Sequence, residues 1–359
     1  MKKKIKSFKI GNKNIGPGFP LFFIAEAGVN HNGSLSKALK MVDVAKNSGA
    51  DAVKFQSFKT NNLILPNAPK SKYHIETTGS SKKQTWYNLL KTQEMSNEMH
   101  YKIIQYCKKK KIIFLSTPYD EESADLLEKF NVNAYKIAST DNSNIPLLEY
   151  IAKKKKPMLI STAMANMSEV RDAVNSVRKY ISNKFVLLQC TGNYPSKNED
   201  SNLNVMLTYK KNFNCLYGYS DHTAGYVNPI AAAALKASVY EKHFTLDKNM
   251  KGPDHRMSLT PLELKKTIKI IRETEQALGV TDKKVLKSEQ HNRTRLKKSL
   301  VSKQFINKGV RLNSKMFAIK RPGSGLAPKT TYSISNYVAS KNIKPNLTIK
   351  KTMIRRLKK

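Results

Sequence analysis

Polar side chains that can do chemistry follow each of eight short apolar runs in this chain of 359 residues. The first run, within FIAEAGVNHNG, leads to Glu26, Asn30 and His31. The later runs lead to the following side chains: Lys54, Gln56, Ser116, Thr117, Lys136, Ser139, Asp141, Ser161, Thr162, Gln189, Asn193, Tyr194, Ser220, Asp221, His222, Glu241, Lys242 and His243. Gathered in one place, such residues could bind anions, ligate a metal ion and transfer protons.

Eight buried parallel strands would bring these residues together. The apolar runs predict strands at 22–28, 52–57, 112–118, 134–139, 157–162, 185–190, 215–221 and 238–244, and helical patterns occupy the intervals. This alternation predicts an α/β fold, the (β/α)8 TIM barrel, in which every strand ends on the face that carries the active site.

The organisation of the chain predicts two domains. The barrel should occupy 1–280, and the polar stretch 281–295 reads as a linker. Beyond it, 296–359 has short alternating segments separated by turn signals, which predicts a small β-rich domain. The segment 59–98 is too long for an ordinary connection and holds Tyr73, His74 and Trp86, so it predicts a lid or substrate wall.

Two lysines predict an anion site. Lys54 and Lys136 each end a strand that should be buried, and a buried lysine needs a partner. Together on one face they would bind a dianion such as a phosphate, with serine and threonine hydroxyls as hydrogen-bond donors. The alternative is that each lysine only pairs with a carboxylate of the protein.

Two histidines predict a metal site. His222 and His243 end the seventh and eighth strands, which are neighbours in a closed barrel, and could share Mn²⁺, Zn²⁺ or Fe²⁺. Glu26 and Asp141 are the carboxylates best placed for acid–base work. Asp254 follows the eighth strand and either faces the site or caps a turn. His31 is either catalytic or a loop histidine bonded to the backbone.

The formal charge of +39 raises the question of nucleic-acid binding, but lysine is spread over the chain without interleaved aromatic residues. Two dense runs, 108–111 and 153–156, precede the third and fifth strands and should lie at the opposite end of the barrel. They are solvated lysines or a surface for an anionic partner. Three scattered cysteines favour buried thiols and a reducing cytoplasm, and no apolar stretch is long enough for a membrane span.

Several motifs resemble the sialic acid synthase family: FIAEAGVNHNG, VKFQSFK, FLSTP, KIAS, GYSDHT and EKHFTLDKNMKGPDHRMSL. The tail NRTRLKKSLVSKQFINKGV…KRPGSGLAP is similar to the antifreeze-like (SAF) domain of that family. The resemblance implies a transferase that condenses phosphoenolpyruvate with the aldehyde form of an N-acetylated aminosugar. The favoured sugar is N-acetylmannosamine, which would give N-acetylneuraminate and phosphate. N,N'-diacetyllegionaminate or pseudaminate synthesis is the alternative within the family. A basic nucleic-acid-binding protein or an inactive scaffold is the alternative outside it.

The resemblance also implies roles for individual residues. It implies that phosphoenolpyruvate is bound by Lys54, Thr117, Lys136, Ser139, Ser161, Asn193 and Ser220. It implies that Gln56, Asp141, Tyr194 and Asp254 bind the sugar. It also implies that His222 and His243 bind a divalent metal ion, with Mn²⁺ favoured over Mg²⁺ or another ion. Arg321 would reach the sugar of the partner subunit in a domain-exchanged homodimer. The chain departs from the family at Thr140-Asp141, where Gly-Glu is usual, and this shortens the carboxylate by one methylene.

Overall fold

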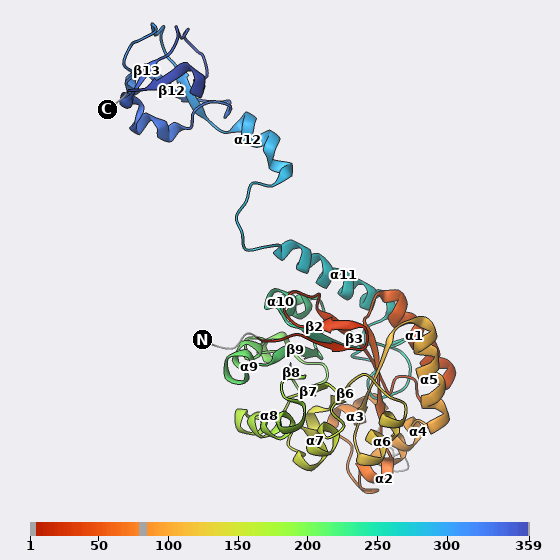
Figure 1. Cartoon of the computed structure of the whole chain (residues 1–359). Helices are drawn as coiled ribbons and strands as arrows, with labels where there is room; N and C mark the ends of the chain where they lie inside the picture. Colours follow the sequence, from red (N-terminus) through yellow and green to blue (C-terminus); the bar gives the residue numbers. More distant parts are fainter. Residues whose placement is uncertain (1–4, 79–84, 358–359) are drawn as a thin grey trace. The chain divides into compact units, whose positions relative to one another are not determined.

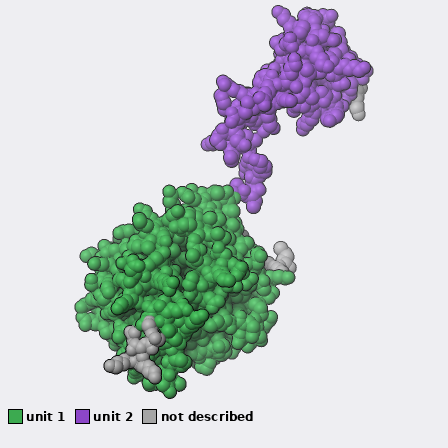
Figure 2. Space-filling view, turned by 180° about the vertical axis from the view of Figure 1, so that it is seen from behind, with its two compact units in different colours: residues 1–279 green, residues 280–359 purple. Residues whose placement is uncertain are grey.

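The computed structural model describes residues 5–78 and 85–357. The chain separates into two compact units, Met1–Gly279 and Val280–Lys359, which are coloured separately in Figure 2. The first unit holds the parallel sheet and the helices around it, and the second holds short strands and turns.

The first unit is a (β/α)8 barrel, as the sequence predicts. Its strands are β3 (Phe22–Gly28), β4 (Ala52–Ser57), β5 (Ile113–Pro118), β6 (Tyr135–Ile137), β7 (Met158–Ser161), β8 (Phe185–Cys190), β9 (Leu216–Asp221) and β10 (Val239–His243). They pair in parallel in the order β5-β4-β3-β10-β9-β8-β7-β6, and the two end strands of this order are neighbours. All eight strands lie within a residue or two of the predicted ranges.

Helices surround the sheet (Figure 1). They are α1 (Leu35–Ser48), α5 (Asn97–Lys110), α6 (Glu121–Lys129), α7 (Ile145–Ala152), α8 (Met167–Ile181), α9 (Val205–Phe213), α10 (Val227–Ala234) and α11 (Pro261–Leu278). The start and stop signals of α1 work as expected: the Ser34 side chain accepts from Lys37 N, and Gly49 ends the helix at φ 89°. Thr260 and Glu263 form a capping box at the start of α11.

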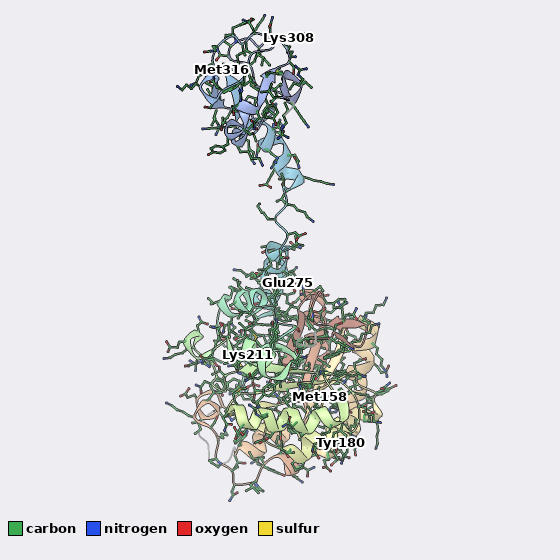
Figure 3. All side chains as sticks on the ribbon, turned by 60° about the vertical axis from the view of Figure 1, so that its left-hand side comes forward. Met158, Tyr180, Lys211, Glu275, Lys308 and Met316 are labelled. Carbon is green, nitrogen blue, oxygen red and sulfur yellow. The ribbon has the colours of Figure 1, made fainter. Side chains whose placement is uncertain are left out.

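Strand alternation sorts the core into two layers. Residues that point outward, such as Met158 on β7, pack beneath the helices (Figure 3). Residues that point inward fill the barrel with apolar side chains: Phe22, Ile24, Ala52, Ile113, Leu115, Ala134, Leu159, Val186, Leu188, Leu216 and Val239. Because side chains alternate along a strand, every second residue points inward. The last inward residues of the strands therefore lie at the active-site face.

An N-terminal hairpin, absent from the sequence-based prediction, closes the other end of the barrel. Strands β1 (Phe8–Ile10) and β2 (Lys13–Ile15) pair antiparallel around a turn with Gly11 at φ 56°. Ile10 and Ile15 are fully buried and join the inward-facing apolar side chains. A lysine-rich segment therefore contributes two apolar residues that seal the base of the core.

The lysine runs lie at the amino ends of their strands, as predicted, and part of their charge is matched within the chain. Lys110 Nζ lies 2.6 Å from Asp43, Lys154 pairs with Asp125 at 2.5 Å, and Lys156 lies 3.0 Å from Glu128. These exposed or half-exposed pairs favour the interpretation of the runs as solvated lysines of the barrel base.

The second unit has its own small core. Strands β11 (Ser299–Ser302) and β12 (Phe317–Lys320) pair antiparallel, as do β13 (Tyr337–Ala339) and β14 (Ile354–Arg356). Leu300, Ile306 and Ile349 are among its buried residues. Within the stretch expected to be a linker, the helix α12 (Gln290–Leu296) forms. In the described part of the chain, no helix has the length and apolarity that crossing a bilayer requires.

Candidate active site

A layer of polar side chains lies directly above the apolar filling of the barrel. Counting two residues on from the inward apolar positions gives the charged members Glu26, Lys54, Lys136 and Glu241, with Ser161 and Cys190 beside them. On β9 the inward positions are Leu216, Gly218 and then Ser220, so Ser220 joins the same layer. All of them line one cavity of about 1050 Å³. We call Glu26, Lys54, Lys136, Ser220 and Glu241 the charged floor of this cavity.

Two lysines and one carboxylate form the centre of the floor. Lys54 Nζ lies 3.8 Å from Glu241 Oε2, and Lys136 Nζ lies 3.6 Å from Glu241 Oε1. Ser220 donates to Glu241 Oε1 at 3.0 Å. Burial raises the pKa of Glu241, but the two lysines outweigh burial and hold it below its usual range. The floor therefore carries two cations that are only partly neutralised, which suits a dianion.

Each lysine also donates a hydrogen bond to a hydroxyl group on a neighbouring strand. Lys54 Nζ donates to Thr117 Oγ1 at 3.0 Å, and Lys136 Nζ donates to Ser161 Oγ at 2.7 Å. Both side chains are at most 4% exposed. Burial lowers the pKa of Lys136, whereas the carboxylates of the floor outweigh burial and raise that of Lys54.

Glu26 is the best acid–base candidate. Its Oε2 lies 2.8 Å from Lys54 Nζ. Burial raises the pKa of Glu26 to about 7, although Lys54 opposes the shift. A carboxyl group with a pKa close to neutrality can both accept and return a proton. The sequence alone could not give this value, because it depends on complete burial and on the nearby Glu241.

The β-bulge at the end of β3 keeps space open beside Glu26. The register of β3 against β4 shifts between Glu26 and Gly28, and Gly28 has φ 51°. A Cβ on Gly28 would lie 3.4–3.5 Å from atoms of Glu26, Gln56 and His243. Glycine therefore serves both the left-handed backbone and the room at the floor.

The two histidines come together as predicted. The ring centroids of His222 and His243 are 5.5 Å apart. His222 Nδ1 donates to the Thr191 carbonyl at 2.7 Å, which leaves Nε2 for another partner. His243 Nδ1 is buried without a hydrogen-bond partner and lies 4.0 Å from Asp254 Oδ2. Two buried imidazoles with open nitrogens fit a divalent cation.

Protonation of this pair depends on its surroundings. Burial, with the charge of His222, holds the pKa of His243 well below its usual range, so this ring is neutral. Burial also lowers the pKa of His222, but Cys190 and the Thr191 carbonyl outweigh it and raise the value to about 9. A cation would therefore displace a proton from His222. Among the described residues, no third histidine, cysteine or carboxylate completes a metal-binding group.

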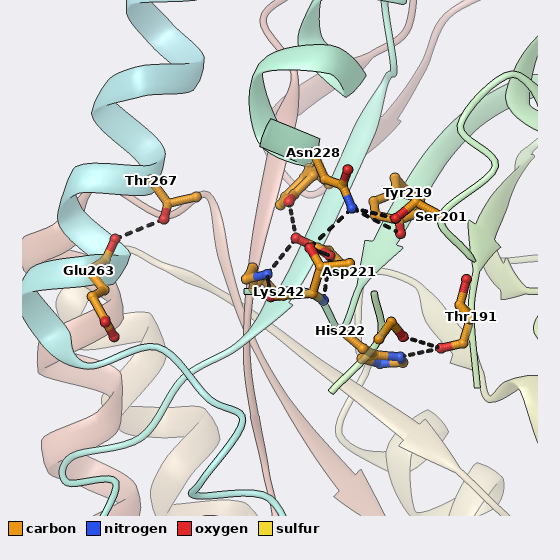
Figure 4. A network of polar contacts seen from close by, with 12 residues as sticks. Thr191, Ser201, Tyr219, Asp221, His222, Asn228, Lys242, Glu263 and Thr267 are labelled. Atoms are coloured by element: carbon orange, nitrogen blue, oxygen red, sulfur yellow. Dashed lines mark hydrogen bonds and ion pairs between the residues drawn. The ribbon is translucent and has the colours of Figure 1, made fainter. Parts of the chain in front are cut away.

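A second polar network involves Asp221 and Lys242, the residues that precede His222 and His243 in the sequence (Figure 4). Asp221 and Lys242 alternate with the inward residues and point outward, where they form an ion pair at 2.5 Å with both side chains at most 2% exposed. Asp221 also accepts from Thr223 N at 2.8 Å and from the Tyr240 hydroxyl. Asn228 on α10 donates to Thr223 Oγ1 at 3.0 Å. The network fixes the ends of β9 and β10, each adjacent to a histidine.

The structure brings most predicted site residues to the cavity. Its lining includes Glu26, Lys54, Gln56, Thr117, Lys136, Ser139, Ser161, Asn193, Tyr194, Ser220, His222, His243 and Asp254. Asp141 is not among the lining residues: its carboxylate accepts from Asn144 Nδ2 at 3.1 Å and from Thr140 Oγ1 at 3.4 Å. Arg321 belongs to the second unit and is exposed there.

Three further observations add to the prediction. Glu241 is central to the floor, and Cys190, expected to be a buried thiol, is buried but lines the cavity with Sγ 3.7 Å from His222 Nδ1. His31 does not line the cavity, and its Nδ1 accepts from Gly33 N at 3.0 Å, which is the backbone-bonded alternative. Strand alternation was the available signal for Glu241, since it lies two residues before His243.

The long segment after β4 forms a wall of the cavity, as predicted. It contains α2 (Thr60–Leu63), α3 (Lys72–Thr78) and α4 (Trp86–Gln93); we call these described parts the lid. Tyr73, His74 and Trp86 all line the cavity. The His74 and Trp86 rings are 4.9 Å apart, and the Tyr73 ring lies 5.9 Å from that of Tyr194. The Tyr194 ring in turn lies 4.2 Å from His222.

Fold and floor together define a (β/α)8 barrel whose cavity holds two buried lysines beside a pair of histidines. The NeuB family matches the chain over residues 41–283, and the chain belongs to this family. It is 43% identical over 329 residues to N,N'-diacetyllegionaminic acid synthase of Campylobacter jejuni, which covers 91% of this chain and 98% of the relative. The enzyme of the same name from Legionella pneumophila is 40% identical over 348 residues, 96% of either chain.

A solved structure agrees with this assignment. The N-acetylneuraminic acid (sialic acid) synthetase of Leptospira borgpetersenii, crystallised with citrate, matches with a TM-score of 0.70 and 34% identity. The match covers 81% of this chain and 96% of that one. The chain is thus a transferase, a phosphoenolpyruvate-dependent synthase of nonulosonic acids.

Proposed function

We propose that the enzyme condenses phosphoenolpyruvate with the open-chain aldehyde of a hexose that carries two acetamido groups, giving N,N'-diacetyllegionaminate or a close relative. The sequence alone favours N-acetylmannosamine. The cavity of about 1050 Å³ has room for this larger sugar together with phosphoenolpyruvate. The names of the two relatives described above support the same choice.

The charged floor would hold phosphoenolpyruvate. Lys54 and Lys136 would bind its phosphate and carboxylate, with Thr117, Ser161 and Ser220 as hydrogen-bonding neighbours. Their positive charge would stabilise the phosphate as it leaves. Ser139, whose Oγ accepts from Ala163 N at 3.0 Å, and Asn193 line the same cavity and complete this group.

The reaction needs one new carbon–carbon bond and one water molecule. The enol carbon of phosphoenolpyruvate bonds to the aldehyde carbon, whose oxygen takes a proton and becomes a hydroxyl. Water adds to the neighbouring carbon, and the carbon–oxygen bond to phosphate then breaks to leave a ketone. Glu26, with its pKa raised to about 7 by burial, would accept the proton of the attacking water.

His222 and His243 would hold a divalent cation, for which Mn²⁺ is the favoured candidate. The unpartnered His243 Nδ1 and the open His222 Nε2 support this assignment. A bound cation supplies Lewis-acid polarisation of the sugar aldehyde. Asp254, with a pKa raised to about 6 by burial, would orient a sugar hydroxyl beside this pair, and Gln56 and Tyr194 would contact the rest of the sugar.

Phosphate release with a panel of sugars tests the proposal. Purified enzyme, Mn²⁺ and phosphoenolpyruvate are incubated with N-acetylmannosamine, with a 2,4-diacetamido-2,4,6-trideoxymannose and with the corresponding altrose. The highest kcat/KM is expected for the diacetamido mannose. Higher efficiency with N-acetylmannosamine or with the altrose would reject the proposed sugar.

We further propose that Arg321 acts in the barrel of a partner subunit within a domain-exchanged homodimer. Arg321 is exposed on a turn next to Pro322 and can present its guanidinium to a ligand. Arg321→Ala and Lys54→Met proteins should each have low activity alone, and a mixture that is refolded together should exceed the mean of the two, because exchange restores some complete sites. No recovery from verified mixed dimers would show that each small domain does not serve a partner's barrel.

A further inference from the structure

We propose that Tyr73, on the lid helix α3, recognises the second acetamido group of the sugar and thereby determines substrate specificity. The inference rests on the proposed function, since it requires an aminosugar in the cavity. It concerns a residue outside the strand ends, on a segment that the sequence predicts to be a lid or substrate wall.

The position of Tyr73 suits the far end of an extended sugar. Its ring contacts Tyr194 at 5.9 Å, and Tyr194 contacts His222 at 4.2 Å, so a row of rings leads from the histidine pair to the lid. All three residues line the cavity. A sugar with its aldehyde near the histidines would extend its later carbons along this row toward Tyr73.

The Tyr73 hydroxyl is a buried donor without a partner. Within the described residues its Oη has essentially no solvent exposure and makes no hydrogen bond. Buried tyrosine hydroxyls normally have a partner, so an unpaired one beside a cavity indicates a place for a ligand atom. Burial, reinforced by the charge of Asp254, raises the pKa of Tyr73 to about 12, and the hydroxyl therefore keeps its proton at neutral pH.

An acetamido group has both features that this corner of the cavity can bind. Its carbonyl oxygen would accept from Tyr73 Oη, and its methyl group would pack against the edge-to-face pair of His74 and Trp86. A sugar hydroxyl on the same carbon places its oxygen two bonds closer to the carbon chain. It would leave Tyr73 Oη unpaired and the aromatic pair uncovered, and a site built in this way rejects it.

The test compares Tyr73→Phe with a matched control from the same lid. Tyr87→Phe also removes one hydroxyl, but that hydroxyl donates to Asn61 Oδ1, and Tyr87 does not line the cavity. For wild type and both variants, kcat/KM is measured for the diacetamido mannose and for N-acetylmannosamine at saturating phosphoenolpyruvate. The KM of phosphoenolpyruvate and the thermal midpoint are measured in parallel.

Tyr73→Phe should lower kcat/KM for the diacetamido sugar by about 10- to 100-fold, the loss expected for one buried hydrogen bond to a ligand. It should leave N-acetylmannosamine efficiency and the KM of phosphoenolpyruvate within about twofold, and Tyr87→Phe should change none of these values. Equal losses with both sugars, or no loss with either, would overturn the role of Tyr73. Failure of the wild type to use the diacetamido sugar would instead reject the proposed function, and the inference with it.

Discussion

The charged floor and the lid meet the same cavity with opposite kinds of side chain. The floor presents four ionisable groups that are all nearly fully buried. Each lysine lies within 4 Å of a carboxylate: Lys54 of Glu26 and Glu241, and Lys136 of Glu241. The lid presents mainly the rings of Tyr73 and Trp86 and the imidazole of His74, and its two charged lining residues, Lys72 and Glu76, are exposed. Chemistry with phosphate is thus built on strands, and contact with the sugar is shared with a segment between them.

The floor and the lid differ because buried charges and aromatic rings need different degrees of fixed positioning. A buried charge is tolerable only when its partners stay in fixed positions, and paired strands provide these. Aromatic rings lose little when they move slightly, so a connecting segment can carry them. A change of sugar can therefore be accommodated in the lid without disturbing the floor.

The largest expected effect concerns the outward ion pair beneath the histidines. Lys242→Met leaves Asp221 buried and unpaired, and should reduce the free energy of unfolding by about 3–5 kcal/mol. Urea denaturation followed by circular dichroism measures this loss. Lys179→Met is the control, because its pair with Glu149 is exposed and should contribute less than about 1 kcal/mol. Equal losses in the two variants would remove the contrast between buried and exposed charges.

The next effect separates the floor from the lid in substrate use. Lys54→Met and Lys136→Met should each lower kcat/KM for phosphoenolpyruvate by about one to two decades, since a charge-assisted hydrogen bond contributes roughly 1.5–3 kcal/mol. The KM of the sugar should change much less. Lys59→Met, at the start of the lid and 3.6 Å from Glu94, serves as the control. Wild-type efficiency in either floor variant would reassign that lysine to structure.

A smaller effect is expected at the histidine pair. His222→Ala and His243→Ala should each weaken Mn²⁺ binding by at least about tenfold, and chelation should abolish turnover that Mn²⁺ then restores. Equilibrium dialysis measures the affinity directly, with the exposed His291→Ala as control. Undiminished Mn²⁺ binding in both histidine variants, or full activity in chelator, would contradict the metal site.

The strands and most of the floor could be predicted because each buried strand is a compact apolar run that ends in polar residues. The inward position of Glu241 also follows from the sequence, because side chains alternate along a strand and Glu241 lies two residues before His243. Asp221 and Lys242 occupy the alternate positions and point outward. The structure was needed for Asp141, whose carboxylate is used by its neighbours Thr140 and Asn144.

Other features depend on contacts that no local pattern reveals. The β1–β2 hairpin buries Ile10 and Ile15 within a segment dominated by lysine, so composition hides it. The row of rings from Tyr73 to His222 joins residues from three separate parts of the chain. Such contacts are set by tertiary packing, and they are the ones that carry the proposed sugar specificity.

The smallest expected effect is a pH dependence of stability that should be larger for the barrel than for the lid. Burial lowers the pKa of His31 from 6.5 to about 4. The unfolded chain therefore takes up this proton first, and the stabilising contribution of neutral His31 is lost as pH falls from about 6.5 toward 4. Between pH 7 and 6 the loss should be below about 1 kcal/mol. His31→Asn, which keeps an acceptor for Gly33 N, should flatten this part of the stability profile in urea titrations. Burial also lowers the pKa of His74 in the half-buried lid, so His74→Asn should flatten the profile too, but less than His31→Asn because His31 is fully buried. An equal flattening by the two variants would contradict the link between burial and the size of the effect.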